Sequence, residues 1–96
     1  DKKMIKKEYK GKRCKVTFQI KPEKAEYVEI IGSWNSWQPE RMKRKRDGTF
    51  YITKTFEVGK EFEFRYVIDG KEYVNDPEAD GYIKNPFGTD NCILKT

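Results

Sequence analysis

The stretch Phe62-Glu63-Phe64-Arg65-Tyr66-Val67-Ile68-Asp69-Gly70 carries the sequence pattern that decides the fold of this chain. Phenylalanine, tyrosine and isoleucine occupy every second position from 62 to 68, with glutamate, arginine and valine between them. Because successive side chains of a β-strand point to opposite faces, this alternation predicts a strand with one buried face. Asp-Gly is a preferred hairpin-turn dipeptide, so we expect a second, short strand at residues 72–74.

Similar patterns recur on both sides of this stretch. We expect further strands at residues 14–20, 27–31, 50–56 and 91–95, and a short basic strand at 41–46. Residues 75–90 contain two Xaa-Pro pairs and two glycines, which predicts a long irregular loop. About seven strands at regular spacing predict an all-β fold, built as an antiparallel two-sheet sandwich.

The composition agrees with this fold class. Val, Ile, Phe, Tyr and Trp number 27, whereas Ala, Leu and Met number five, and β-branched and aromatic residues favour strands over helices. A chain of 96 residues has room for one hydrophobic core. The sequence shows neither an apolar run of the length that a membrane span needs nor a signal-peptide pattern, so we expect a cytoplasmic domain without membrane contact.

The histidine and cysteine content of the chain limits the catalytic and metal-binding chemistry that it can carry out. The chain has no histidine, which removes the histidine-dependent nucleophile systems, imidazole metal ligands and the commonest general base. Its two cysteines, Cys14 and Cys92, are too few for a cysteine-only zinc site. They lie near opposite ends of the chain, where they would bridge the first and last strands if oxidised or remain reduced in a cytoplasmic protein. We expect no metal and no organic cofactor.

The positive charge is concentrated near the N-terminus. Residues 1–15 hold eight basic and two acidic side chains, whereas the remaining 81 residues hold 13 basic and 14 acidic ones. We therefore expect a poorly ordered basic tail at residues 1–12 and a folded domain at residues 13–96. The basic run at 41–46 is interpreted as a solvent-facing strand that discourages edge pairing.

Four stretches in register resemble a known family. They are Val28-Glu29-Ile30-Ile31-Gly32-Ser33-Trp34-Asn35-Ser36-Trp37, Phe64-Arg65-Tyr66-Val67-Ile68-Asp69-Gly70, Asn75-Asp76-Pro77 and Asn85-Pro86-Phe87-Gly88-Thr89-Asp90-Asn91. Their order and spacing resemble carbohydrate-binding module family 48, the glycogen- and starch-binding early-set domain. That domain occurs beside branching and debranching enzymes of glycoside hydrolase family 13 and in the beta subunit of AMP-activated protein kinase. The resemblance covers roughly residues 13–96 and implies an immunoglobulin-like, early-set sandwich.

The resemblance also implies a carbohydrate-binding site. The matching motif positions are Trp37, Arg65, Tyr73, Phe87, Thr89 and Asn91. Trp37 ends the family's loop motif and is the expected main platform for a sugar ring. Arg65 occupies a position where the family usually has lysine, and a guanidinium presents its donors in a different geometry from an ammonium group. Tyr73 occupies a position where the family often has tryptophan, so this platform for a sugar ring is smaller. The implied ligand is an α-glucan such as glycogen, starch or a maltooligosaccharide, and the implied partner is a glycogen- or starch-active enzyme.

The chemistry of these side chains suits a sugar. The face of a glucose ring is an apolar patch ringed by hydroxyl groups, and a rigid aromatic ring covers such a patch at little entropy cost. Polar groups at the rim orient the sugar, because an unpaired buried donor costs about 1–3 kcal/mol. We therefore expect non-catalytic α-glucan binding, with the aromatic residues on separate loops matching the curve of the chain.

Five of these six residues also have a purely structural interpretation. Trp37 would be a core residue, Tyr73 an edge-strand residue, and Arg65 the partner of Glu63 or Glu72 in a cross-strand ion pair. Thr89 and Asn91 would stabilise the turn into the last strand. Phe87, between Pro86 and Gly88 in a loop, has little core to join and is expected to be exposed. Trp34 is expected to pack against the core rather than to bind ligand.

Three other functions compete with glucan binding. A glycosidase needs two carboxylates across a cleft, and the available aspartates are Asp69, Asp76, Asp80 and Asp90. Asp69 and Asp76 precede Gly70 and Pro77, so turn formation accounts for both. A sandwich this small also has little room for such a cleft, so we expect no enzyme activity. The nearly neutral body argues against nucleic-acid binding by the aromatic residues. The remaining alternative is a structural or protein-docking module that accompanies a glycoside hydrolase family 13 enzyme and binds no sugar.

Overall fold

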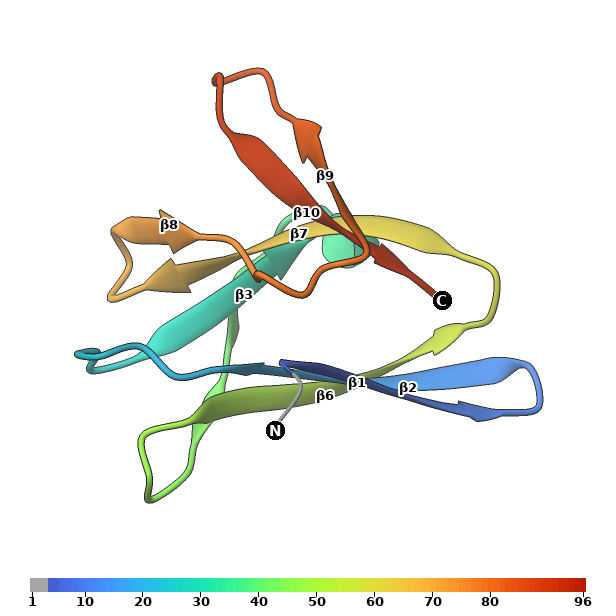
Figure 1. The fold of residues 1–96 in the computed structure, drawn as a ribbon, viewed down its shortest axis with the longest axis horizontal. Helices are drawn as coiled ribbons and strands as arrows, with labels where there is room; N and C mark the ends of the chain where they lie inside the picture. Colours follow the sequence, from blue (N-terminus) through green and yellow to red (C-terminus); the bar gives the residue numbers. More distant parts are fainter. Residues whose placement is uncertain (1–3) are drawn as a thin grey trace.

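Two antiparallel sheets form a sandwich in the computed structural model, which describes residues 4–96 (Figure 1). The first sheet has the strand order β1 (Ile5–Lys10), β2 (Arg13–Ile20), β6 (Phe50–Glu57) and β5 (Lys43–Arg44). The second has the order β4 (Glu40–Arg41), β3 (Val28–Gly32), β7 (Glu61–Ile68), β10 (Asp90–Lys95) and β9 (Gly81–Lys84), with β8 (Glu72–Val74) paired to β7. The predicted all-β, two-sheet antiparallel sandwich is confirmed.

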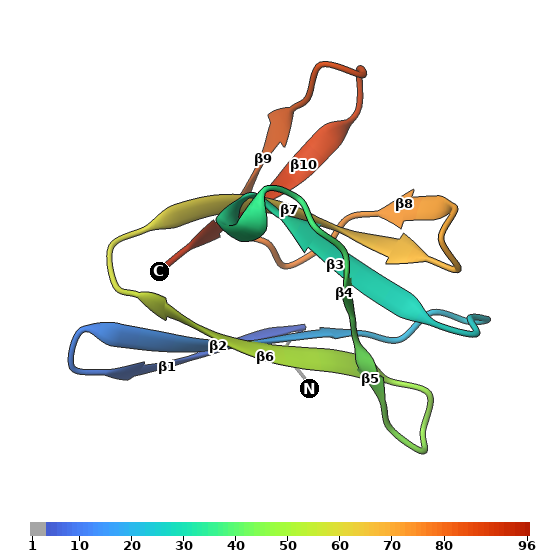
Figure 2. The ribbon, with the colours of Figure 1, turned by 180° about the vertical axis from the view of Figure 1, so that it is seen from behind.

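The chain changes sheets within the basic run at residues 41–46. Residues 43–44 pair with β6 in the first sheet, whereas Arg41 pairs with β3 in the second, and the buried Met42 lies between the two pairings (Figure 2). The prediction of one continuous strand here is therefore wrong. A buried methionine inside a run of charges marks the crossover, because the side chain enters the space between the sheets while its neighbours stay in solvent.

Residues 5–10, which fall within the predicted poorly ordered tail, form an edge strand of the sandwich. Ile5 to Lys10 form β1, in register with β2 from Phe18 to Arg13, and the Ile5 side chain is buried. The predicted boundary between residues 12 and 13 is thus wrong for β1. The sequence of this strand does not show a clear alternation of apolar and charged residues. Of the positions 5, 7 and 9 on one face, only Ile5 is aliphatic, and Lys7 is charged like the residues on the other face. The part of the predicted tail at residues 1–3 lies outside the described residues.

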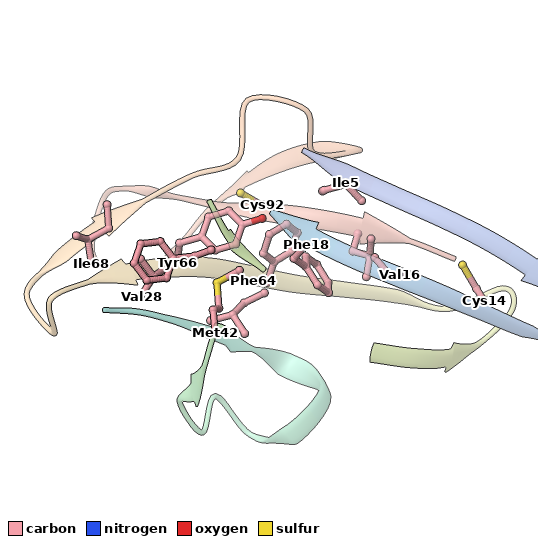
Figure 3. Packing of buried hydrophobic residues seen from close by; sticks show 13 residues of the cluster. Ile5, Cys14, Val16, Phe18, Val28, Met42, Phe64, Tyr66, Ile68 and Cys92 are labelled. Atoms are coloured by element: carbon pink, nitrogen blue, oxygen red, sulfur yellow. The ribbon is translucent and has the colours of Figure 1, made fainter. Parts of the chain in front are cut away.

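The core lies between the sheets and draws on inward positions from both. Phe18 of β2 packs edge-on against Phe64 of β7, with ring centroids 5.1 Å apart, and Phe64 packs against Tyr66 at 5.7 Å (Figure 3). Cys14 of β2 and Cys92 of β10 are both buried and both free thiols, so no disulfide joins these two strands. The alternation at residues 62–68 predicts the inward face of β7 correctly. On the other face Glu63 and Arg65 are partly exposed, whereas Val67 is buried.

A buried polar contact fastens the loop after β8 to the core. The carboxylate of Asp76, fully buried, accepts hydrogen bonds from the hydroxyl of Tyr66 at 2.7 Å and from the backbone N–H of Glu78 at 2.8 Å. The backbone N–H of Asp76 donates to Sγ of Cys92 in β10, and the hydroxyl of Tyr82 in β9 donates to the Asp76 carbonyl. The segment after β8 is thereby held against β7, β9 and β10 together.

Residues 75–90, predicted to be a single irregular loop, contain a strand. Gly81 to Lys84 form β9, which pairs with Ile93 to Asp90 of β10 and makes a hairpin that projects from the sandwich (Figure 1). Tyr82 and Ile83 are both largely exposed, so the segment has no alternation of apolar and polar residues to reveal it. The pairing comes from backbone hydrogen bonds to β10.

Gly32 ends β3 where an aromatic ring crosses the backbone. A Cβ atom at this position would lie 2.5 Å from the indole ring of Trp34, which belongs to the short 3₁₀ helix η1 (Ser33–Asn35). The indole packs against Phe18, Phe56 and Phe62, as expected for a tryptophan of the core. No helix among residues 4–96 is long and apolar enough to cross a membrane.

We predict that Gly32→Ala lowers the free energy of unfolding by about 2–3 kcal/mol, because the new methyl group displaces the Trp34 ring from its aromatic neighbours. The control is Gly81→Ala, since a Cβ at Gly81 meets Ile93 at an ordinary 3.5 Å. Chemical denaturation monitored by fluorescence measures both variants. A Gly32→Ala protein as stable as Gly81→Ala would contradict this packing.

Candidate functional site

The candidate site lies where β7 exchanges one neighbouring strand for another. Residues 61–64 of β7 pair with β10, and residues 66–68 pair with β8. The two neighbours diverge on either side of Arg65, which pairs with Ile31 of β3 on the opposite edge. Because the aromatic residues at 64 and 66 point into the core, the Arg65 side chain points to the solvent face of the second sheet. Arg65 therefore stands in the fork between β8 and the β9–β10 hairpin.

Arg65 bridges the two arms of this fork. Its Nε donates to Oδ1 of Asn75, after β8, at 2.9 Å, and its Nη1 donates to Oγ1 of Thr89, before β10, at 3.1 Å. The guanidinium carbon also lies 5.6 Å from the centroid of the Tyr73 ring, within the range of a cation–π contact. Within residues 4–96, Arg65 forms no ion pair with Glu63 or Glu72, the partners that a purely structural role would give it.

Asn85 organises the tip of the β9–β10 hairpin. Its side-chain carbonyl accepts hydrogen bonds from the backbone N–H groups of Phe87 and Thr89, at 3.0 and 3.2 Å. Its side-chain amide donates to Oγ1 of Thr89 at 2.8 Å and to Oδ1 of Asn91 at 3.1 Å. One side chain therefore fixes the three predicted residues of this loop, and leaves the Phe87 ring 90% exposed.

Trp37 is presented by a loop with an unusual backbone. Ser36 and Trp37 both have left-handed conformations, with φ of 60° and 64°, which costs non-glycine residues about 1–2 kcal/mol each. Local hydrogen bonds hold them there, since the Trp37 N–H donates to the Gly32 carbonyl and Oδ1 of Asn35 accepts from the Gln38 N–H. The indole is 36% exposed, so Trp37 is a surface residue and not the core residue of the alternative interpretation.

Glu40 anchors this loop from below. Its Oε1 accepts hydrogen bonds from Nε1 of Trp34 at 3.0 Å and from Nδ2 of Asn35 at 3.1 Å, and its Oε2 pairs with Nζ of Lys54 at 2.6 Å. Burial acts to raise the pKa of this carboxyl, but the hydrogen bonds from Lys54 and Trp34 outweigh it and hold the pKa below its ordinary 4.5. The ionised form of Glu40 is therefore the one that stabilises the fold.

These segments surround one open groove of about 740 Å³ on the second sheet. Its lining residues are Ile31, Trp37, Glu63, Arg65, Tyr73, Asn85, Pro86, Phe87, Thr89 and Asn91. All six residues predicted from the sequence line it. Trp37 and Phe87 come from separate loops and Tyr73 comes from β8, where it is 56% exposed. Three large exposed aromatic side chains thus share a single hollow with an arginine and several amide and hydroxyl groups.

Four of the lining residues were not predicted from the sequence. Ile31 and Glu63 lie on the solvent face of β3 and β7, and their alternation with the inward residues was a usable signal for both. Asn85 and Pro86 open the last motif stretch of the resemblance, but their own turn-forming character carries no information about a groove. The structure also gives Asn91 a partner in Glu63, because its Nδ2 donates to Oε1 of that glutamate at 3.0 Å.

The four aspartates considered for catalysis lie outside the groove. Asp69 accepts hydrogen bonds from the backbone N–H groups of residues 26 and 27, and Asp76 is buried in the core. Asp80 pairs with Lys7 of β1 and accepts from the backbone N–H of residue 95, and Asp90 begins β10. Among residues 4–96, no group of three or more His, Cys, Asp or Glu side chains is placed to hold a metal ion.

An open groove on the solvent face of a small β-sandwich is typical of a ligand-binding module. The family model described as the glycogen recognition site of AMP-activated protein kinase matches residues 9–95. The chain therefore belongs to this family of non-catalytic carbohydrate-binding modules. A search of curated proteins found no matching sequence.

Solved structures of two esterases share the fold. The enterobactin esterase of Shigella flexneri superposes with a TM-score of 0.78 at 12% identity, over 99% of this chain and 33% of the esterase chain. The ferric enterobactin esterase of Salmonella typhimurium superposes with a TM-score of 0.79 at 10% identity, over 99% and 34%. Identities this low show the fold alone, and the chain spans about a third of the length of these esterases.

We predict that Glu40→Gln destabilises the domain by about 1 kcal/mol at neutral pH, because a charge-assisted contact to Lys54 is lost. The folded-state pKa of Glu40 is lowered, so its contribution is present above pH 4.5 and is lost as the pH falls through the folded-state value. Urea denaturation between pH 3 and 7 measures both proteins. The exposed Glu57→Gln is the control, and a Glu40→Gln penalty that is constant with pH would contradict the assignment.

We predict that Asn85→Ala speeds hydrogen exchange of the Phe87 and Thr89 amides about tenfold, because both lose their acceptor. Asn85→Asp is the matched control, since a carboxylate still accepts from both amides. Exchange is followed by NMR at each backbone amide. Unchanged protection in Asn85→Ala would show that the turn, and not this side chain, orders the loop.

Proposed function

We propose that this chain is a non-catalytic module that binds α-glucan in the groove on its second sheet. The observation that best supports this function is that three exposed aromatic residues, Trp37, Tyr73 and Phe87, line one groove together with the guanidinium of Arg65. Membership of a glycogen-recognition family supports glycogen as the natural polymer. Starch and maltooligosaccharides share its α-linked glucosyl units and belong to the same ligand class.

The aromatic side chains supply the affinity in this proposal. A glucosyl ring placed on an indole or phenyl face buries apolar C–H surface on both partners, which gives about 25 cal/mol for each Å² removed from water. An α-glucan is curved, and platforms carried by three separate segments suit a curved ligand better than a flat row. Phe87, almost fully exposed at the hairpin tip, is free to contact several faces of the ligand.

The polar side chains supply orientation. Thr89 Oγ1 already accepts hydrogen bonds from Asn85 and Arg65, so its own hydroxyl hydrogen is left to donate to a sugar oxygen. Arg65 uses two of its five N–H groups on the protein, and the others are available to sugar hydroxyls. Because these groups are fixed before ligand binds, little entropy is lost in ordering them.

The glucan-active enzyme expected from the resemblance remains part of the proposal as a partner. A module that holds a glucan chain raises the local concentration of that chain for an enzyme tethered to it. The second candidate function is a protein-docking module that binds no sugar. Polysaccharide binding by the isolated chain distinguishes the two functions, because only the glucan-binding module has it.

We predict that glycogen in a native gel retards the wild-type protein and that Trp37→Ala abolishes most of the retardation. Loss of one stacking platform removes about 1.5–3 kcal/mol, which is a tenfold or larger drop in affinity. Tyr9→Ala is the matched control, because Tyr9 is a largely exposed aromatic residue of β1 outside the groove.

Two results would contradict the proposal. A folded wild type that glycogen does not retard would remove sugar binding and favour the docking module. Equal retardation of wild type and Trp37→Ala would keep the function but move the platform elsewhere.

A further inference from the structure

Glu63 is the one acidic side chain among the residues that line the groove. It lies two residues before Arg65 on the same strand, so both side chains stand on the solvent face of β7, with their Cα atoms about 7 Å apart. No ion pair joins the two within the described part of the chain. The groove thus holds a carboxylate and a guanidinium side by side and not neutralised by direct contact.

The hydrogen bonds of the groove leave this carboxylate as its principal acceptor. The side-chain carbonyl of Asn85 already accepts two hydrogen bonds, and Thr89 Oγ1 accepts two. The side-chain carbonyl of Asn91 accepts one from Asn85. Glu63 accepts one from Asn91 at Oε1, and Oε2 has no hydrogen-bond partner among residues 4–96. Donors outnumber acceptors in the rest of the groove, since Arg65 retains three N–H groups.

A sugar diol needs both kinds of group. Each hydroxyl has one hydrogen to donate and lone pairs to accept, so two adjacent hydroxyls are best read by an acceptor and a donor that stand side by side. Glucosyl units within an α-1,4-linked chain carry free hydroxyls at O2 and O3 on neighbouring carbons. We propose that Glu63 is a specificity-determining residue that accepts a hydrogen bond from one hydroxyl of the O2–O3 pair while Arg65 donates to the other.

This inference rests on the proposed glucan binding and narrows the ligand class. The site would take neutral glucans with free O2 and O3, and an ether or acyl group on these oxygens would remove the hydrogen that Glu63 accepts. A phosphate ester there would also meet the like charge of the carboxylate. An α-glucan with O2 and O3 both unsubstituted is therefore the expected ligand.

The test combines Glu63→Gln with three forms of the cyclic heptaglucan β-cyclodextrin, which are unmodified, methylated at every O6, and methylated at every O2 and O3. Glutamine keeps the shape and the acceptor for Asn91 but loses the charge. Glu61→Gln is the matched control, because Glu61 is an exposed carboxylate of the same strand outside the groove. Affinities are measured by titration calorimetry. For a weakly binding ring, the ring is added at millimolar concentration and its affinity is obtained from displacement of a stronger ligand.

We expect Glu63→Gln to weaken the unmodified and O6-methylated rings about fivefold, since a charge-assisted hydrogen bond is roughly twice as strong as a neutral one. Binding of the O2,O3-methylated ring should be weaker in the wild type and unchanged by the substitution. Equal weakening of all three ligands, no weakening at all, or the same loss in Glu61→Gln would overturn the role of Glu63. Failure of the wild type to bind the unmodified ring would instead overturn the proposed function.

Discussion

The groove depends on the point in β7 where the neighbouring strand changes from β10 to β8. A continuous ladder along β7 would leave a flat sheet face, and a flat face has no hollow in which a ligand can be surrounded. Because the two neighbours diverge, Arg65 is free to reach both arms through Asn75 and Thr89. The exchange of partners along one strand is what converts a solvent face into a site.

The same constraint links the site to the stability of the fold. Directly beneath the fork, Asp76 joins Tyr66 of β7 to the segment after β8 and contacts Cys92 of β10. Burial raises the pKa of the Asp76 carboxyl, against the lowering effect of the hydrogen bonds from Glu78 and Tyr66, and burial raises the pKa of Tyr66 as well. A buried carboxylate left without its donor is costly, so this network stabilises the arrangement of the strands at the fork.

Sequence patterns predict the parts of this structure that period-two alternation encodes. The inward face at residues 62–68, the Asp69-Gly70 turn and the two-sheet architecture all follow from it. β1 and β9 could not be predicted this way, because edge strands form through backbone pairing and carry few buried apolar residues. The six site residues came from matching a family motif. Alternation places Glu63 on the solvent face, but its contact with Asn91, 28 residues away, is not visible in the sequence, and the turn-forming Asn85 gives no sign that its side chain orders the hairpin tip.

In the proposed complex, a neutral α-glucan occupies the groove between Trp37, Arg65 and the β9–β10 hairpin. The most direct test is a ¹H–¹⁵N NMR titration of the protein with maltoheptaose. We expect saturable shifts of the Trp37 indole N–H, the Arg65 Nε–H and the side-chain amides of Asn85 and Asn91, with the first sheet unaffected. Absence of any saturable shift, or shifts centred on β1, β2 and β6, would contradict it.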